Sequence, residues 1–427
     1  MTTQEQQQII QLIQKEVVPA IGCTEPIAVA LAAAKAREVR GDIPEKILIS
    51  LSTNVLKNAM GVGIPGTGMY GLPIAVALGV LIGKSEYRLE VLKETRPEAV
   101  EQAKAYVNGK HIRILHKKDA PDKLFIEVVC CKADDTVKVV ISGSHTHFSH
   151  ISKNGSVLME ESAETAEAPE QQENVRLNFR KVYDFATTVP LRDIRFIMKT
   201  VELNRNAAET ALKGHYGHEL GKTIQSLHRR DFFGRSLYAR IISYTSAACD
   251  ARMAGARIPV MSNSGSGNQG IVATLPVWVY AQRKKISRQK LIRALTLSHL
   301  CVIYIKQGFG RLSPLCGCVV AAIGSACGLT YLMGCSYEQI TYSIKNMIAN
   351  ITGMLCDGAT PSGSLKVSTG VSTAIFSAIM AVEGKTVTSA EGIIDNDVDQ
   401  CIRNMVSIGT QGMRETDCCI LDIMTEK

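Results

Sequence analysis

The sequence predicts an α+β fold, with a large and mostly α-helical domain and a smaller inserted α+β domain. From about residue 191 to the end, apolar residues recur at the three- and four-residue spacing of helices. Between about residues 89 and 151, short segments such as EVL, IRIL, LFIEVVCC and TVKVVISG instead have the pattern of strands. With 427 residues, 46% of them hydrophobic and 21% charged, the chain has ample material for buried cores.

The domain boundaries are placed where these patterns change. We expect residues 1–45 and 190–427 to form the helical domain and residues 46–189 to form the α+β domain. A linker or arm at about residues 155–175 contains six glutamates between Glu160 and Glu173. Such a run is typical of a solvated loop, and we assign it no function.

The individual elements follow from periodicity and from residues that break it. A first helix over residues 3–18 ends near Pro19, and Lys46 to Ser52 alternates apolar and polar residues as a strand does. The other elements expected before residue 110 are helices at 24–37, 72–83 and 97–108 and a glycine-rich loop at 61–71. After residue 190 the expected helices are 192–213, 235–254, 270–284, 287–306, 315–333, 336–354 and 364–383.

Charge and hydropathy argue against two classes of partner. The formal net charge is +8 and aromatic residues make up 5%, so neither the electrostatic footprint nor the stacking platform of a nucleic-acid-binding protein is expected. The uncharged stretch at residues 312–337 is long enough to consider a membrane span. Because Pro314 and four glycines interrupt it, we expect buried helices there and no membrane.

The thirteen cysteines need an explanation. The N-terminal residues MTTQEQQQII lack the basic start and apolar stretch of a secretory signal, so we expect a cytoplasmic protein with reduced thiols. Most of the cysteines are then expected to be small packing residues, because free cysteine is among the most buried residue types. The remainder are candidates for metal binding or catalysis.

Two glycine patterns resemble a dinucleotide-binding fingerprint, and we reject both. In GVGIPG, residues 61–66, Pro65 removes a backbone donor that the phosphates need. In GSGNQG, residues 265–270, no acidic residue follows within reach of a ribose, because none occurs between Asp250 and Glu338. We therefore expect no NAD.

The second glycine segment has another interpretation. The acid-free interval contains ten Lys or Arg residues, including Lys306 and Arg311, and SNSGSGNQG, residues 262–270, precedes a predicted helix. Glycines let successive N–H groups converge, and a helix N-terminus favours an anion. A small carboxylate or phosphate suits such a site, and a plain capped turn is the alternative.

Several cysteines and histidines are candidates for chemistry. Cys23 lies where a helix begins, a position that lowers the pKa of a thiol; a buried inert thiol is the alternative. Thr24 is a candidate cap of that helix. In the C-terminal half, CGC at 316–318 and CDG at 356–358 place thiols beside glycine, and thiolates select iron–sulfur or zinc. His145 and His147 share one face of a predicted strand, which we interpret as a surface strand.

At these residues the sequence resembles the bacterial and archaeal L-cysteine desulfidases, relatives of the α chain of iron–sulfur L-serine dehydratases. The matching segments run in order along nearly the whole chain, and GCTEP and the LCGC and CDGA pair are the specific ones. They are VVPAIGCTEPIAVALAAAKA (17–36), STNVLKNAMGVGIPGTG (52–68), SNSGSGNQG (262–270), IKQGFGRLSPLCGCVVAA (305–322), GMLCDGA (353–359) and SLKVSTG (364–370).

The resemblance implies an activity and a cofactor. Enzymes of this kind carry a [4Fe–4S] cluster held by three cysteines, and its open iron acts as a Lewis acid on the β substituent of a small amino acid. A base removes the Cα proton, the substituent leaves, and the product is hydrolysed to pyruvate and ammonia. No pyridoxal phosphate is involved. The family resemblance also makes a homodimer plausible.

The resemblance also implies roles for particular residues. Cys316 and Cys356 match cluster ligands, and Cys318 is a further candidate for metal binding. In the GCTEP motif, Cys23 matches the general base and Glu25 is assigned to catalysis with it. The residues expected to bind substrate are those of the glycine-rich segment and of a second signature: Ser264, Gly265, Ser266, Gly267, Asn268, Asn54, Lys57 and Asn58.

One position departs from the family pattern. The pattern CDGAxxSC ends in a further cysteine, whereas here the segment reads CDGATPSG and Gly363 stands where the third ligand belongs. Cys318 or another nearby thiol then substitutes, or the cluster is labile, or the site holds none. The alternatives to a desulfidase are therefore a cluster-less homologue that binds a small amino acid or another anion, and an L-serine dehydratase-like deaminase.

Overall fold

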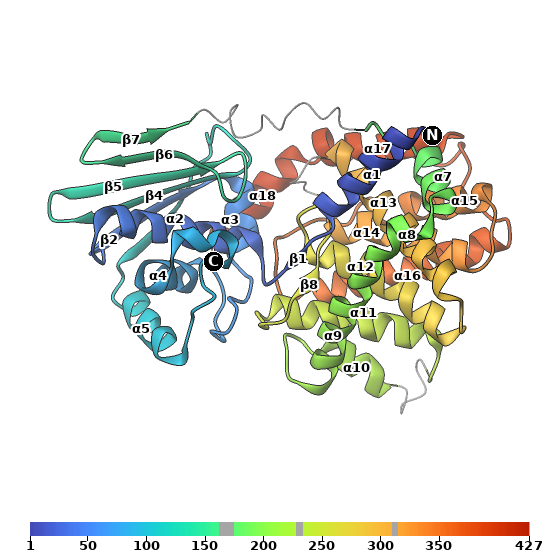
Figure 1. Ribbon diagram of the computed structural model, residues 1–427, viewed down its shortest axis with the longest axis horizontal. Helices are drawn as coiled ribbons and strands as arrows, with labels where there is room; N and C mark the ends of the chain where they lie inside the picture. Colours follow the sequence, from blue (N-terminus) through green and yellow to red (C-terminus); the bar gives the residue numbers. More distant parts are fainter. Residues whose placement is uncertain (162–174, 228–233, 310–314, 427) are drawn as a thin grey trace.

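The protein has two lobes, which Figure 1 shows side by side. The computed structural model describes residues 1–161, 175–227, 234–309 and 315–426. We call the lobe that contains the six-stranded sheet the sheet lobe and the other the helical lobe; each has its own large hydrophobic core. The predicted α+β class is confirmed. The acidic segment at 162–174, as well as Arg311 and Pro314, lies outside the described residues.

The sheet lobe is a mixed sheet covered on one face by helices. Its strand order is β3-β2-β4-β5-β6-β7, antiparallel except for the parallel pair β2 and β3. The strands are β2 (Lys46–Leu51), β3 (Ile112–His116), β4 (Phe125–Lys132), β5 (Asp135–Ser142), β6 (Phe148–Lys153) and β7 (Ser156–Glu160). The helices are α2 (Thr24–Arg40), α3 (Thr53–Ala59), α4 (Leu72–Ile82), the 3-10 turn η1 (Ser85–Glu90) and α5 (Pro97–Asn108).

Helix α2 belongs to the sheet lobe, whereas the sequence placed residues 24–45 with the helical domain. Its buried face, from Ile27 to Ala36, joins the core formed by the sheet and α4. Alanines make this possible because they let the helices approach closely: a Cβ on Gly79 of α4 would lie 2.5 Å from the Ala30 carbonyl oxygen. The segment EVL at 90–92, expected as a strand, instead forms the end of η1 and a turn.

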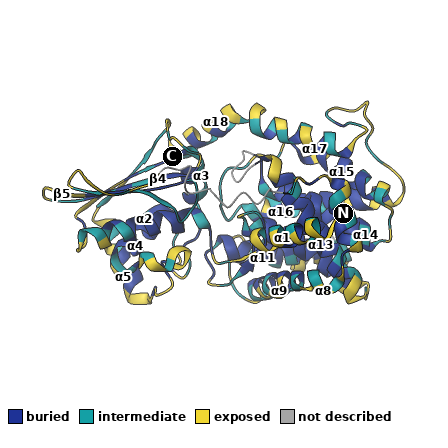
Figure 2. Cartoon of the chain, turned by 45° about the horizontal axis from the view of Figure 1, so that its top comes forward, coloured by how far each residue is buried: buried dark blue, intermediate teal, exposed yellow. Residues whose placement is uncertain are grey.

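The helical lobe is built around helices that are buried on nearly all sides (Figure 2). Its N-terminal contribution is α1 (Thr3–Glu16), begun by a capping box between Thr2 and Glu5. The remaining elements are α7 (Phe179–Thr188), α8 (Leu191–Ile194), η2 (Arg195–Ile197), α9 (Met198–Lys213), α10 (Leu220–Leu227), α11 (Leu237–Met253), α12 (Gly267–Arg283), α13 (Arg288–Phe309), α14 (Gly317–Leu332), α15 (Tyr337–Ile351), α16 (Gly363–Val382), α17 (Val398–Ser407) and the π-turn η4 (Ile408–Gly412).

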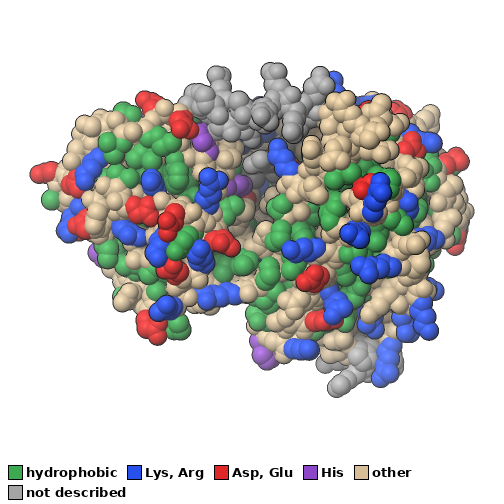
Figure 3. Space-filling view, in the orientation of Figure 1, with side chains coloured by type: hydrophobic (Ala, Val, Ile, Leu, Met, Phe, Trp, Pro, Cys, Tyr) green, Lys and Arg blue, Asp and Glu red, His purple; other side chains and the backbone are tan. Residues whose placement is uncertain are grey.

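The uncharged segment around residues 312–337 contains α14, a core helix of this lobe. Glycines let it pack closely on α13, since a Cβ on Gly324 would lie 2.5 Å from the Ser298 carbonyl oxygen. Within the described residues one helix, α16, is long and apolar enough to cross a membrane by length and composition, and half of its apolar window is buried inside the protein. On the face seen in Figure 3, acidic and basic side chains are intermixed.

Close backbone contacts join the two lobes. Between them, the Gly63 N–H donates to the Met253 carbonyl oxygen at 2.9 Å, and beside this contact strand β1 (Pro19–Ala20), which follows α1, pairs with β8 (Val260–Met261). A Cβ on Gly63 would lie 2.3 Å from the carbonyl carbon of Ala254, so only glycine fits there. The glycine-rich loop that resembled a phosphate-binding pattern is therefore a contact between the lobes.

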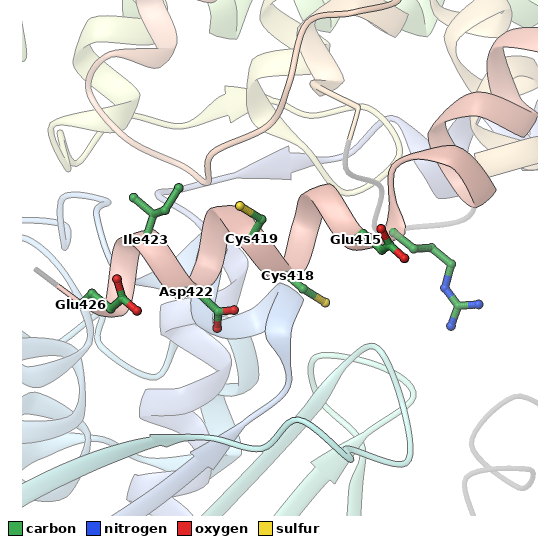
Figure 4. Close-up of a pocket in the computed structure, with 7 residues that line it drawn as sticks. Glu415, Cys418, Cys419, Asp422, Ile423 and Glu426 are labelled. Carbon is green, nitrogen blue, oxygen red and sulfur yellow. The ribbon is translucent and has the colours of Figure 1, made fainter.

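The last helix, α18 (Arg414–Thr425), reaches from the helical lobe to the sheet lobe (Figure 1). Leu421 is fully buried in the sheet-lobe core, and Asp417 forms a buried ion pair with Lys57 of α3. Cys418 and Cys419 point to different sides of the helix (Figure 4). The residues that line the pocket drawn there come from α18 and from Glu426, which follows it.

We expect Lys57→Met to destabilise the protein by about 3–5 kcal/mol, because it leaves the buried Asp417 carboxylate without its cation. The double variant Lys57→Met with Asp417→Leu should recover most of the lost stability, since no unpaired charge remains buried. Urea unfolding of the single and double variants measures both effects. A single variant as stable as the parent would show that the pair does not hold α18 in place.

Candidate functional site

The site begins at the N-terminus of α2, where Cys23 and Glu25 form a hydrogen-bonded pair. Gly22 has a positive φ of 70° and turns the chain into Cys23, which is extended and precedes the first helical residue, Thr24. The Cys23 Sγ donates to the Glu25 Oε2 at 2.9 Å, and the Asn58 Nδ2 donates to the other carboxylate oxygen at 3.3 Å. Cys23, not the expected Thr24, is the cap residue, and its side chain serves Glu25 rather than the helix backbone.

The charges around this pair fix its protonation state. Burial opposes ionisation of Glu25, but the charge of His145, the hydrogen bond from Cys23 and Arg252 together hold its pKa below the usual value. Burial, followed by the adjacent Glu25 carboxylate, raises the pKa of Cys23 well above that of an ordinary thiol. The free protein thus has an ionised Glu25 beside a protonated Cys23. The lowered thiol pKa expected from the helix N-terminus is not found, because burial and a carboxylate outweigh it.

His145 reaches this pair from the sheet lobe. It lies in the turn between β5 and β6 rather than in the predicted strand, since β6 begins at Phe148. Its charge lowers the pKa of Glu25. The neighbouring histidines do not join it: His147 faces Glu161 at 3.2 Å and His150 faces Glu160 at 3.7 Å.

The glycine-rich segment forms the predicted turn before a helix. Ser264 and Gly265 have positive φ values of 47° and 79°, and α12 begins at Gly267. The Ser264 N–H donates to the Glu16 carbonyl oxygen and the Ser266 N–H to that of Asn263, so the turn itself uses them. The first intrahelical bond comes from the Gly270 N–H. The amides that precede it, at 267–269, are the N-terminal groups of the helix that lack an intrahelical partner, the kind that can bind an anion.

Arg252 is the residue of this site that sequence reasoning missed. It is buried at 6% exposure at the end of α11, and its Nε has no hydrogen-bond partner among the described residues. A Cβ on Gly267 would lie 2.2 Å from that Nε, so glycine at the start of α12 makes room for the guanidinium. A buried guanidinium without a full set of partners is suited to an anionic ligand. The sequence feature that could have indicated Arg252 is its position in the interval between Asp250 and Glu338, which contains no acidic residue.

Two polar side chains beside Arg252 also have an unused acceptor. The Asn268 Oδ1 and the Gln269 Oε1 are buried without a hydrogen-bond partner in the described part of the chain. Gln269 is only 3% exposed. A buried amide oxygen of this kind is costly unless a ligand or water donates to it. The start of α12 therefore offers donors for a carboxylate and acceptors for an ammonium or hydroxyl group.

The predicted metal-binding cysteines lie together at the start of α14. The Cys316 N–H donates to the Met354 carbonyl oxygen at 3.1 Å, and Leu315 forms a β-bridge with Leu355, which brings the CGC segment alongside Cys356. A hydrogen bond from Cys318 holds the pKa of the Cys316 thiol below its usual value, although burial opposes this. We call Cys316, Cys318 and Cys356 the thiol site.

The donors of the thiol site fit an iron–sulfur cluster by their chemistry. In the described part of the chain, no three His, Cys, Asp or Glu side chains are arranged to hold a single metal ion. A cubane cluster needs a wider spacing, because each thiolate binds a different iron. Burial raises the pKa of Cys356, while the charges of Lys57 and Lys366 lower it. Buried thiols with cations near them favour a soft, electron-rich group over a hard cation.

The remaining predicted residues have different roles. Lys57 is paired with Asp417, so its ammonium group is not directed to a substrate. Asn58 holds Glu25, and Asn54 lies half-buried in the first turn of α3. Lys306 is buried near Cys356: burial lowers its pKa to about 8, against the opposing charges of Cys356 and Glu16. Lys57 and Asn58 of the second signature are thus engaged by other side chains, and substrate binding by this signature stays a prediction.

These features coincide with a family match. Residues 86–422 match the family model described as serine dehydratase alpha chain, and the chain belongs to this family. It is 61% identical over 427 residues to a UPF0597 protein of Bacteroides fragilis, with the full length of both covered. UPF0597 proteins of Porphyromonas gingivalis, 53% identical with full coverage of both chains, and Aeromonas hydrophila, 42% identical over 98% of this chain and 96% of its own length, are also similar.

We expect Glu25→Gln to lower the pKa of Cys23, because it removes the carboxylate that opposes the thiolate. Alkylation of Cys23 at pH 8, followed by mass spectrometry, should become several-fold faster. Glu38→Gln is the matched control, since it removes the same charge from the exposed far end of α2. Equal rates in the two variants would contradict the assigned coupling.

Proposed function

We propose that this protein is an iron–sulfur-dependent lyase that removes the β substituent of a small amino acid, converting L-cysteine and water to pyruvate, ammonia and hydrogen sulfide. The observation that carries the proposal is the position of Arg252. Its charge acts on Cys23, on Glu25 and on Cys249, and Cys249 is also within reach of the charge of Cys316. The Cys23 and Glu25 pair, the start of α12 and the thiol site therefore all lie near the buried guanidinium of Arg252.

Residues of the helical lobe bind the substrate. Arg252 and the amide groups at 267–269 hold the α-carboxylate, and the unpaired amide oxygens of Asn268 and Gln269 accept from the ammonium group. The cluster, bound by Cys316 and Cys356 with one further thiol, would supply a Lewis-acidic iron for the leaving group.

The side chains at the start of α2 transfer the proton. Cys23 is protonated in the free protein, so it must lose its proton before it acts as a base. Glu25 Oε2, 2.9 Å away, is the acceptor within reach. The resulting thiolate takes the Cα proton as the β substituent leaves; the aminoacrylate formed tautomerises to an imine, and water hydrolyses it to pyruvate and ammonia.

The experiment is an assay of anaerobically purified, iron-loaded protein with L-cysteine and with L-serine. We expect pyruvate and sulfide from L-cysteine, and a loss of at least about 100-fold in kcat for Cys23→Ala, because a positioned base contributes this much. Cys327→Ala, a buried cysteine outside the site, should keep its activity. Iron-loaded protein that forms no pyruvate from either amino acid would exclude the lyase.

L-Serine dehydration is the second candidate, and the description of the matching family favours it. It uses the same proton transfer with water as the leaving group. The same assay separates the two, since a kcat/KM that is higher for L-serine identifies a deaminase. Protein that binds either amino acid without turnover identifies the non-catalytic homologue suggested by Gly363.

We expect Arg252→Gln to raise the KM for the amino acid by about 10- to 100-fold, because a charged hydrogen bond contributes about 1.5–3 kcal/mol. Arg240→Gln is the matched control, an exposed arginine on the same helix. Steady-state kinetics of both variants measures the effect. If Arg252→Gln leaves KM at the parent value, the carboxylate binds elsewhere.

A further inference from the structure

The position of Gly363 in space brings it close to another cysteine. Gly363 is the first residue of α16, and a Cβ built on it would lie 3.9 Å from the Sγ of Cys249. A cysteine at 363 would extend its own sulfur from that Cβ into the same space. The Cys249 sulfur, from α11, thus lies near the place that the sulfur of a cysteine at position 363 of α16 would occupy.

Cys249 shares the surroundings of the thiol site. It is fully buried, and the charge of Cys316 raises its pKa, while the charge of Cys249 raises that of Cys318. Arg252 lies one helical turn along α11 from it. Cys249 therefore lies within electrostatic range of both Cys316 and Cys318, in agreement with its position beside Gly363.

A second observation shows that this space is prepared for a ligand. Gln269 is 3% exposed, and its Oε1 has no hydrogen-bond partner among the described residues. Its side chain lies against Gly317, since a Cβ there would be 3.2 Å from the Gln269 Cγ. Gly317 separates Cys316 from Cys318. An unsatisfied, buried amide therefore borders the thiol site.

We infer that Cys249 supplies the third cluster thiolate in this chain, together with Cys316 and Cys356. The inference rests on the proposed function, because it assumes that an iron–sulfur cluster is bound. Other buried cysteines are engaged elsewhere: the Cys327 Sγ contacts the Cys301 Sγ at 3.8 Å, and Cys23 donates to Glu25. Cys318 is the competing ligand, but it occupies a position beside Cys316 and not the position of residue 363.

The test is anaerobic reconstitution of the full chain with iron and sulfide, followed by iron and sulfide analysis and visible absorption spectroscopy. We expect about four irons per chain in the parent protein. Cys249→Ala should lose most of this iron and the thiolate-to-iron absorption, whereas Cys327→Ala should retain both. Cys249→Ala combined with Gly363→Cys should recover them, because the sulfur returns from α16 to the same place.

Recovery in the double variant separates loss of a ligand from loss of the fold, and thermal unfolding of the iron-free variants checks this independently. Full iron content in Cys249→Ala would overturn the inference, as would loss of iron in Cys318→Ala but not in Cys249→Ala. A parent protein that binds no iron would overturn it together with the proposed cofactor. A Cys249-dependent cluster in a protein that forms no pyruvate would refute the proposed function and leave the ligand assignment standing.

Discussion

The close approach of the two lobes at Gly63 and Gly255 is the constraint on which the site depends. At this contact the two backbones nearly touch: a Cβ on Gly255 would lie 2.7 Å from the carbonyl carbon of Gly63. Beside this contact, Arg252 at the end of α11 is close enough for its charge to act on Cys23 and Glu25 at the start of α2. Glu25 lies on α2 of the sheet lobe, Cys23 at the start of that helix packs in the helical-lobe core, and Arg252 comes from α11, so neither lobe contains the site alone.

The electrostatics of the site follow from this convergence. An ionised carboxylate, a guanidinium and several thiols are all removed from water, which magnifies each charge–charge interaction. The carboxylate is stabilised by His145 and Arg252, so the cost of burying Glu25 is distributed over both lobes. The same arrangement keeps Cys23 protonated at rest. The protonation states of Cys23 and Glu25 are therefore set by groups from three separate segments: the start of α2, the turn between β5 and β6, and the end of α11.

Local pattern was sufficient to predict much of the architecture. Apolar periodicity predicted α11 to α16 to within a few residues, and the alternation in residues 46–52 predicted β2, in which Ile47, Ile49 and Leu51 are buried. Alternation and periodicity report only which face of an element is apolar. They could not show that α2 would leave the helical lobe, because that depends on the fit between Ala30 and Gly79.

For the site, motifs indicated Cys23, Glu25, Cys316 and Cys356, and the structure reveals how they are held. The raised pKa of Cys23 could not be predicted from its position at a helix start. It depends on burial and on the Glu25 carboxylate, which is next to the thiol only in the folded protein. Arg252 and Cys249 lie in no recognised motif. Each acquires its role from a glycine that is distant in sequence, at 267 and 363 respectively.

The docking of α18 also constrains how the chain acquires its structure during synthesis. Every other element of the sheet lobe precedes residue 161, yet Leu421 completes its core and Asp417 neutralises Lys57. A ribosome must translate the whole helical lobe before these partners emerge. Until then the nascent sheet lobe exposes the apolar surface that Leu421 covers and an uncompensated ammonium group, features that favour aggregation of an unfinished chain.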